Sequence, residues 1–229
     1  MKRLLWFAFL LLILPLTLSA GIVENFDNIG TLAGNGWVMT NNSSTGGTTG
    51  WFQGNPAVFT AHSGPPESYI AANFNNAGFG GNISNWLMTP VFDLSSPNRI
   101  TFWTRTEAGS NFPDSLEVRL STNGASSNVG ALPTTVGDFT SLLLSINPTL
   151  SVGGYPEGWT QYEIDLAKVG NGVTGRVGFR YLVTDTSVNG DYIGIDNFDQ
   201  IPVPEPMTLL TLGSGLLGIA ARRFRKNRA

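Results

Sequence analysis

The 229-residue sequence contains no cysteine and a single histidine, His62. Without cysteine the chain can form no disulfide, no thiolate metal site and no cysteine nucleophile. One histidine excludes metal sites built from several imidazoles, and a Ser-His-Asp triad would have to use His62. Because His62 stands in a stretch rich in serine, glycine and proline, we interpret it as a solvated loop residue.

Charge is also scarce, since only 13% of the residues are Asp, Glu, Lys or Arg. Seven of the 13 basic residues lie within three residues of the N-terminus or eight of the C-terminus. The part between these ends keeps six basic residues against 15 acidic ones, a net charge of about −9. No basic stripe is left to match phosphates, so the composition argues against nucleic-acid binding.

The N-terminus has the order of features that defines a secretory signal peptide. Lys2 and Arg3 precede an apolar run from residue 4 to 16, and small residues follow at 17–21. We therefore assign residues 1–20 to a signal peptide, with cleavage near Ser19 or Ala20. The alternative is a permanent N-terminal anchor, for which the apolar run is short.

The middle of the chain, residues 21–200, predicts a single all-β domain. Its dominant period is two: Val177, Phe179, Tyr181 and Val183 share one face, and nothing before Met207 predicts a long helix. Gly, Pro and Asn pairs mark turns between the segments. The expected fold is a two-sheet antiparallel jelly-roll sandwich. The strand candidates are 22–27, 36–40, 50–53, 68–74, 86–94, 99–105, 116–120, 139–146, 161–166, 176–183 and 191–198.

The tail, residues 201–229, changes character abruptly. Prolines at 202, 204 and 206 favour an extended segment that joins neither helix nor sheet. An uncharged run follows at 207–221, and as a helix it would reach about 22 Å of a ~30 Å hydrocarbon core. The basic end, 222–229, favours a cytoplasmic location for the terminus. Its basic residues are Arg222, Arg223, Arg225, Lys226 and Arg228.

Val203, Pro204, Glu205 and Pro206, followed by a short apolar helix and an arginine cluster, resemble the PEP-CTERM sorting domain. The resemblance implies a partner, exosortase, an inner-membrane cysteine peptidase-transpeptidase. It is thought to cut at or near the motif and release the protein to the cell surface, often among exopolysaccharide. The chain would then stay in the inner membrane only before processing. The alternative is a plain tail anchor with a proline-rich stalk.

The middle is also similar to the choice-of-anchor J domain, which is related to cleaved-adhesin and MAM-type jelly rolls. The resemblance implies the fold and a surface setting, and it leaves biochemical activity open. It rests on short segments at 24–27, 36–37, 50–52, 84–90, 100–105, 159–166 and 190–198.

Five carboxylates near the first and last strands are candidate ligands for a structural Ca²⁺, which prefers several oxygen ligands from loops and strand ends. In jelly rolls these strands often lie close together, and an ion would compensate for the missing disulfides. The alternative is that they form turns or face solvent. The candidates are Glu24, Asp27, Asp185, Asp191 and Asp196.

No catalytic residue is assigned. Glu163 and Asp165 begin a pattern found on glycosidase strands, but Lys168 stands where that pattern needs a second glutamate. We expect an exported, non-enzymatic surface or matrix protein with an adhesive or structural role. The alternatives are a carbohydrate-binding module and a glycan-active hydrolase. In the former, Trp51, Trp86, Trp103 or Trp159 would stack on sugars, although large aromatics are more often core.

Overall fold

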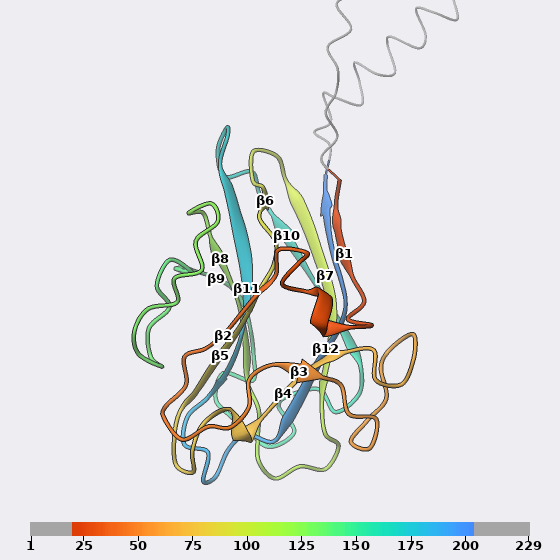
Figure 1. Ribbon diagram of the computed structural model, residues 1–229, viewed down its shortest axis with the longest axis vertical. Coiled ribbons are helices and arrows are strands. Elements are labelled where there is room, and N and C mark those ends of the chain that lie inside the picture. Colours follow the sequence, from red (N-terminus) through yellow and green to blue (C-terminus); the bar gives the residue numbers. More distant parts are fainter. Residues whose placement is uncertain (1–19, 204–229) are drawn as a thin grey trace, which may run out of the picture.

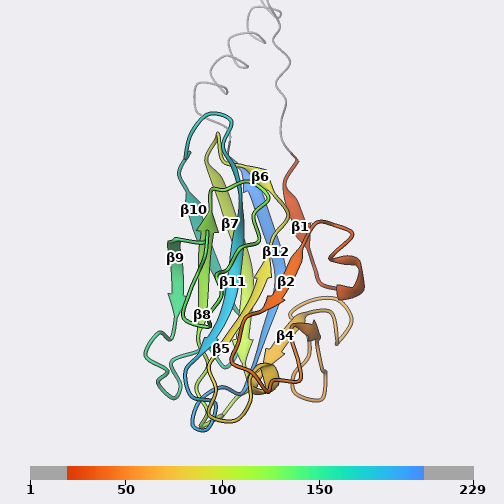
Figure 2. The same ribbon diagram turned by 60° about the vertical axis from the view of Figure 1, so that its left-hand side comes forward.

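The computed structural model describes residues 20–203, which form two antiparallel β-sheets packed face to face (Figures 1 and 2). Apart from strands, these residues contain two single 3₁₀ turns, η1 (Ile29–Thr31) and η2 (Phe74–Asn76). The predicted all-β sandwich is therefore confirmed. Within this described part, no helix is long and apolar enough to cross a membrane.

The first sheet has the strand order β10-β7-β12-β4-β3, and β1 also pairs with β12. β1 and β4 occupy successive stretches of the same side of β12, because β4 pairs with residues 192–195 and β1 with residues 198–200. The strands are β1 (Ile22–Glu24), β3 (Phe52–Gln53), β4 (Ile70–Asn73), β7 (Asn98–Thr106), β10 (Thr160–Leu166) and β12 (Tyr192–Pro202).

The second sheet has the order β2-β5-β11-β8-β9, with β6 paired to the start of β11. Every strand segment predicted from the sequence overlaps at least one of the observed strands. The strands are β2 (Val38–Asn41), β5 (Ile83–Met88), β6 (Phe92–Asp93), β8 (Leu116–Ser121), β9 (Ser141–Ile146) and β11 (Thr174–Val183).

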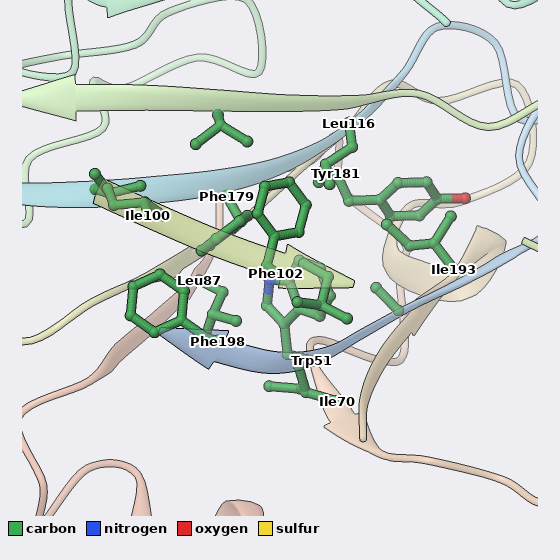
Figure 3. Packing of buried hydrophobic residues seen from close by; sticks show 14 of the residues in the cluster. Trp51, Ile70, Leu87, Ile100, Phe102, Leu116, Phe179, Tyr181, Ile193 and Phe198 are labelled. Atoms are coloured by element: carbon green, nitrogen blue, oxygen red, sulfur yellow. The ribbon is translucent and has the colours of Figure 1, made fainter. Parts of the chain in front are cut away.

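The main core lies between the sheets and is built by the alternation that the sequence predicts. Val177, Phe179, Tyr181 and Val183 all point inward and are fully buried. Phe179 meets Phe102 of the opposite sheet edge to face, with ring centroids 4.9 Å apart. Figure 3 shows these rings with side chains from both sheets. One face of each sheet thus forms a continuous apolar layer.

The outer face of the second sheet is covered as well, by the loop 122–140. Phe139 of this loop packs on Trp86, whose side chain points away from the main core, and Val129 joins them. A Cβ on Gly178 would lie 3.0 Å from the Phe139 ring and 3.1 Å from Trp86, so any larger residue would push these rings outward by a few tenths of an ångström. The loop thereby forms a second, smaller core.

The last strand runs further than the sequence predicts. β12 continues through Pro202, which pairs with Asn98, and the Val203 N–H donates to the Pro97 carbonyl at 2.8 Å. The expectation that Pro202 stays outside any sheet was therefore wrong. Proline is tolerated here because the Val203 N–H points toward β7 and the adjacent Pro202 nitrogen therefore points away from it, on the side where β1 pairs no further than Gln200.

Candidate functional site

Of the four sorting-motif residues, the structure describes only Val203. Its side chain is 37% exposed, and its backbone is held to Pro97 at the end of β12. Pro204, Glu205 and Pro206 lie outside the described residues, as do residues 1–19 of the predicted signal peptide, the apolar run 207–221 and the basic end 222–229.

Within the domain, polar groups gather at a β-bulge in β12, between the stretches paired to β4 and β1. The register with β7 shifts between Asp196 and Asp199, and Asn197 has a left-handed backbone (φ 46°). Bulges and left-handed non-glycine residues are over-represented next to functional sites. The bulge at residues 196–199 is therefore the candidate functional site of the first sheet.

The Asp196 carboxylate holds a loop against this bulge. One oxygen accepts the backbone N–H groups of His62 (2.9 Å) and Ser63 (3.2 Å), and the other accepts that of Asn197 (2.7 Å). Burial raises the pKa of Asp196 to about 6, and the three N–H donors only partly oppose this. Asp196 is one of the calcium ligands that the sequence suggests, and in the structure its carboxylate anchors the loop 54–69.

Asn197 fixes the orientation of His62. Its Nδ2 donates to Asn25 Oδ1 at 3.0 Å, so its Oδ1 is left to accept from Ser63 Oγ and His62 Nδ1, each at 2.9 Å. In this network the neutral imidazole carries its proton on Nδ1, and Nε2 keeps a lone pair. The imidazole is thus a positioned acceptor on the surface, where the sequence predicted an ordinary loop histidine.

Two of the four candidate tryptophans lie beside His62, and two are core. His62 stacks on Trp103 with ring centroids 3.7 Å apart, and Trp159 stands edge-on to it at 6.4 Å. The Trp159 indole N–H donates to the Thr60 carbonyl at 2.9 Å. Both tryptophans are half-buried, whereas Trp51 and Trp86 are buried. We call His62, Trp103 and Trp159 the aromatic surface.

The five candidate calcium ligands do not come together. Asp196 accepts the three backbone N–H groups named above, Glu24 accepts the Phe26 N–H, and Asp185 accepts the Ser187 N–H. Asp185 and Asp191 precede β12, whereas Glu24 lies opposite Phe198, near its other end. In residues 20–203 no three His, Cys, Asp or Glu side chains form a group that could hold a metal ion. Calcium binding stays a prediction from the sequence.

One fully buried carboxyl, Asp114, is not among the candidates that the sequence suggests. It accepts hydrogen bonds from the Tyr181 hydroxyl (2.6 Å) and the Asp191 N–H (2.8 Å), and its other oxygen lies within hydrogen-bonding distance of the Thr106 hydroxyl. Burial raises its pKa to about 6. The cavity beside it has a volume of only about 10 Å³, room for one water, so we assign Asp114 a structural role.

A family model describes the end of the chain. Residues 202–226 match the PEP-CTERM protein-sorting motif. The match indicates an exported protein that is sorted to the cell surface through a processing step in the membrane. Among curated protein sequences, no significant match was found.

Solved structures resemble the domain as a whole. The K1 cleaved adhesin domain of Lys-gingipain from Porphyromonas gingivalis W83 is 21% identical over 81% of this chain and 100% of its own, with a TM-score of 0.58. The K3 domain of the same protein is 19% identical over 79% and 98%, with a TM-score of 0.54. The K2 domain is 18% identical over 80% and 100%, with a TM-score of 0.55. These similarities show a shared β-sandwich fold.

Proposed function

We propose that this chain is an exported, non-enzymatic protein of the cell surface or extracellular matrix, with an adhesive or structural role, delivered by exosortase-type cleavage of its tail. The observation that carries the proposal is the sorting-motif match at residues 202–226, which begins at the last residue of β12. A peptidase that cuts at or near Val203–Pro206 would find its target immediately after a folded domain.

The positions of the domain's ends support this role. Because β1 pairs with the end of β12, residues 20 and 203 lie at the same end of the sandwich (Figure 1). The loops 77–82 and 184–191 lie at the opposite end, joined by a hydrogen bond from the Thr186 hydroxyl to the Gly78 carbonyl. Phe79 in this pair of loops is 91% exposed. An exposed aromatic ring at the end opposite residue 203 is accessible to a partner, as adhesion requires.

The geometry of Glu163 and Asp165 supports a non-enzymatic role. A glycosidase needs an acid and a second carboxylate that both face the bound sugar. Here both side chains project from the edge strand β10 into solvent, with exposures of 51% and 68%, and share the guanidinium of Arg99. This is the arrangement of a solvated strand face.

Replacing Pro204, Glu205 and Pro206 with alanine tests the proposal in the native host. The variant should accumulate in the membrane as a form that retains the tail, while the domain stays folded. A matched control replaces Pro65, Pro66 and Glu67, the same residue types in an exposed loop of the domain, and should be processed normally. Normal release of the tail variant would show that the motif is not the signal.

Carbohydrate binding is the second candidate, favoured by the aromatic surface. Tryptophan rings stack on sugars, and His62 Nε2 offers a fixed acceptor beside them. A glycan array should then detect binding that Trp159→Ala removes and Phe112→Ala keeps, since Phe112 is an exposed ring elsewhere. Equal binding by both variants, or none by the parent protein, would reject this surface as a sugar site.

A further inference from the structure

The strand β9 is an open edge of the second sheet. Its inner side pairs with β8, and no other strand of residues 20–203 pairs with its outer side. Figure 2 shows β9 at the margin of the sandwich. An edge strand presents a row of unpaired N–H and C=O groups, which can be extended by a further strand.

This edge lacks the charges that usually block such pairing. Residues 139–156, which include β9, contain no charged side chain, and Leu142 is 51% exposed. One edge strand of the other sheet, β10, differs, because Glu163 and Asp165 project from it. Charged edges are a common protection against strand addition, so β10 has a protection that β9 lacks.

The sequence of β9 is self-complementary. Residues 141–145 read Ser-Leu-Leu-Leu-Ser, the same in both directions, with Leu143 at the centre. Two copies of this segment, placed antiparallel about a two-fold axis at Leu143, would set Leu142 opposite Leu144 and Ser141 opposite Ser145. An isologous interface requires a surface that is complementary to itself, and the palindrome meets this requirement by pairing leucine with leucine and serine with serine.

We propose that β9 pairs with β9 of a second copy of this chain, joining the second sheets of two molecules into one continuous sheet. Leu143 is also the site of a β-bulge, since the register with β8 shifts there and Leu143 has no partner on β8. A bulge often makes an edge strand unsuitable for pairing with a further strand. Here the bulge would lie on the two-fold axis, so both strands would bend at the same point and their residues would stay opposite one another. Five paired residues bury far less surface than the ~1,600 Å² of a standard interface, so the two molecules bind weakly. The dimer therefore forms only at high protein concentration.

Sedimentation of the protein in the form that its host accumulates tests this proposal. The weight-average mass should rise from that of a monomer toward twice that value as concentration increases to the millimolar range. Leu142→Lys places a charge on the edge and should raise the dissociation constant at least tenfold. Leu132→Lys, at a position 59% exposed in the loop 122–140, should leave it unchanged. A mass that stays monomeric, or equal association by both variants, would overturn the proposal.

Cross-linking tests the register, because the natural chain has no cysteine. Directly opposite residues of antiparallel strands have Cα atoms about 4.5–5.5 Å apart, within the range of a disulfide. Leu143→Cys should therefore oxidise to a dimer. Ser141→Cys should not, since it would lie about 14 Å from its own copy along the strand. Cross-linking of Ser141→Cys in preference to Leu143→Cys would reject the two-fold axis, and the lysine variants still test pairing should Leu143→Cys fail to fold.

Discussion

At the scale of single residues, Asp114 shows how one buried group makes stability depend on pH. The Thr106 hydroxyl lies within hydrogen-bonding distance of both an Asp114 oxygen and the Tyr192 carbonyl, yet it has one proton to donate. If the carboxyl is protonated, it can donate to Thr106 while Thr106 donates to Tyr192. Burial favours that state, because it disfavours the charged form and raises the pKa of Asp114 to about 6.

The sign of the pH effect follows from this raised pKa. The folded state holds the proton more tightly than the unfolded chain, so the stabilisation is complete below pH ~4 and is lost as pH rises through about 6. A difference of about 2 between the two pKa values corresponds to roughly 3 kcal/mol. Asp196, with its pKa also raised to about 6, acts in the same direction.

We predict that Asp114→Asn flattens this dependence. The amide can donate to Thr106 as the protonated acid does. The unfolding free energy of the natural protein should fall by about 3 kcal/mol more than that of the variant as the pH rises from 4 to 7. Urea titrations at several pH values measure it. Asp185→Asn is the control, because hydrogen bonds from Ser187 lower the pKa of this exposed carboxyl and its effect has the opposite sign. An unaltered pH profile in Asp114→Asn would contradict the buried-acid interpretation.

At the scale of secondary structure, strand positions could be predicted from the sequence, but the burial of the outer faces could not. Alternation correctly set Phe179 and Tyr181 on the core face and Arg176 and Arg180 on the other. Both arginines are nevertheless buried. Arg180 contacts Glu117 at 3.0 Å and donates to the Pro133 carbonyl in the covering loop. In that loop, 122–140, Val129, Leu132, Val136 and Phe139 recur at helical spacing, although Gly130, Pro133 and Gly137 interrupt any helix. This pattern does not indicate that an irregular loop covers a sheet.

The loop 122–140 gives an element-scale prediction. Phe139 is fully buried against Trp86, so Phe139→Ala should destabilise the domain by about 3–5 kcal/mol. Denaturant unfolding measures the change, and Phe112→Ala, which removes a ring that is 50% exposed, should cost far less. Equal small losses in both variants would mean that the loop does not act as a second core.

The candidate site was beyond sequence reasoning for a related reason. His62 lies 134 positions from Asp196, and they meet because the loop 54–69 folds back over the first sheet. The sequence marked Trp103 and Trp159 as candidates but could not separate them from Trp51 and Trp86, since burial depends on which loop covers each face. The one sequence feature that marks this site is the single histidine, His62, beside Ser63 and Gly64.

At the scale of the whole molecule, the end of β12 sets the boundary of the folded domain. Ending the chain at residue 200 would remove the pairs Ile201–Arg99 and Pro202–Asn98 and the Val203 hydrogen bond. We predict that residues 21–203 fold alone with a circular dichroism spectrum typical of β-structure, and that they melt at a higher temperature than residues 21–200. A helix-dominated spectrum, or equal melting of the two chains, would contradict this.

Calcium binding, still a prediction from the sequence, concerns the same domain. If some of the five carboxylates bind Ca²⁺ in the folded state alone, millimolar Ca²⁺ should raise the melting temperature above that measured in chelator. Identical melting curves would reject the idea.

The central claim is that the mature protein lacks everything after the Val203–Pro206 motif. The 15 uncharged residues at 207–221 are fewer than the ~20 that a transmembrane helix needs to cross the hydrocarbon core. The motif also follows directly on a strand that ends at Pro202. The most direct test is mass spectrometry of the C-terminus of the protein recovered from the surface of its native host. We predict a C-terminus at or near the motif. Intact peptides that run through Leu216 in surface material would show that the tail is a plain anchor and that exosortase-type processing does not occur.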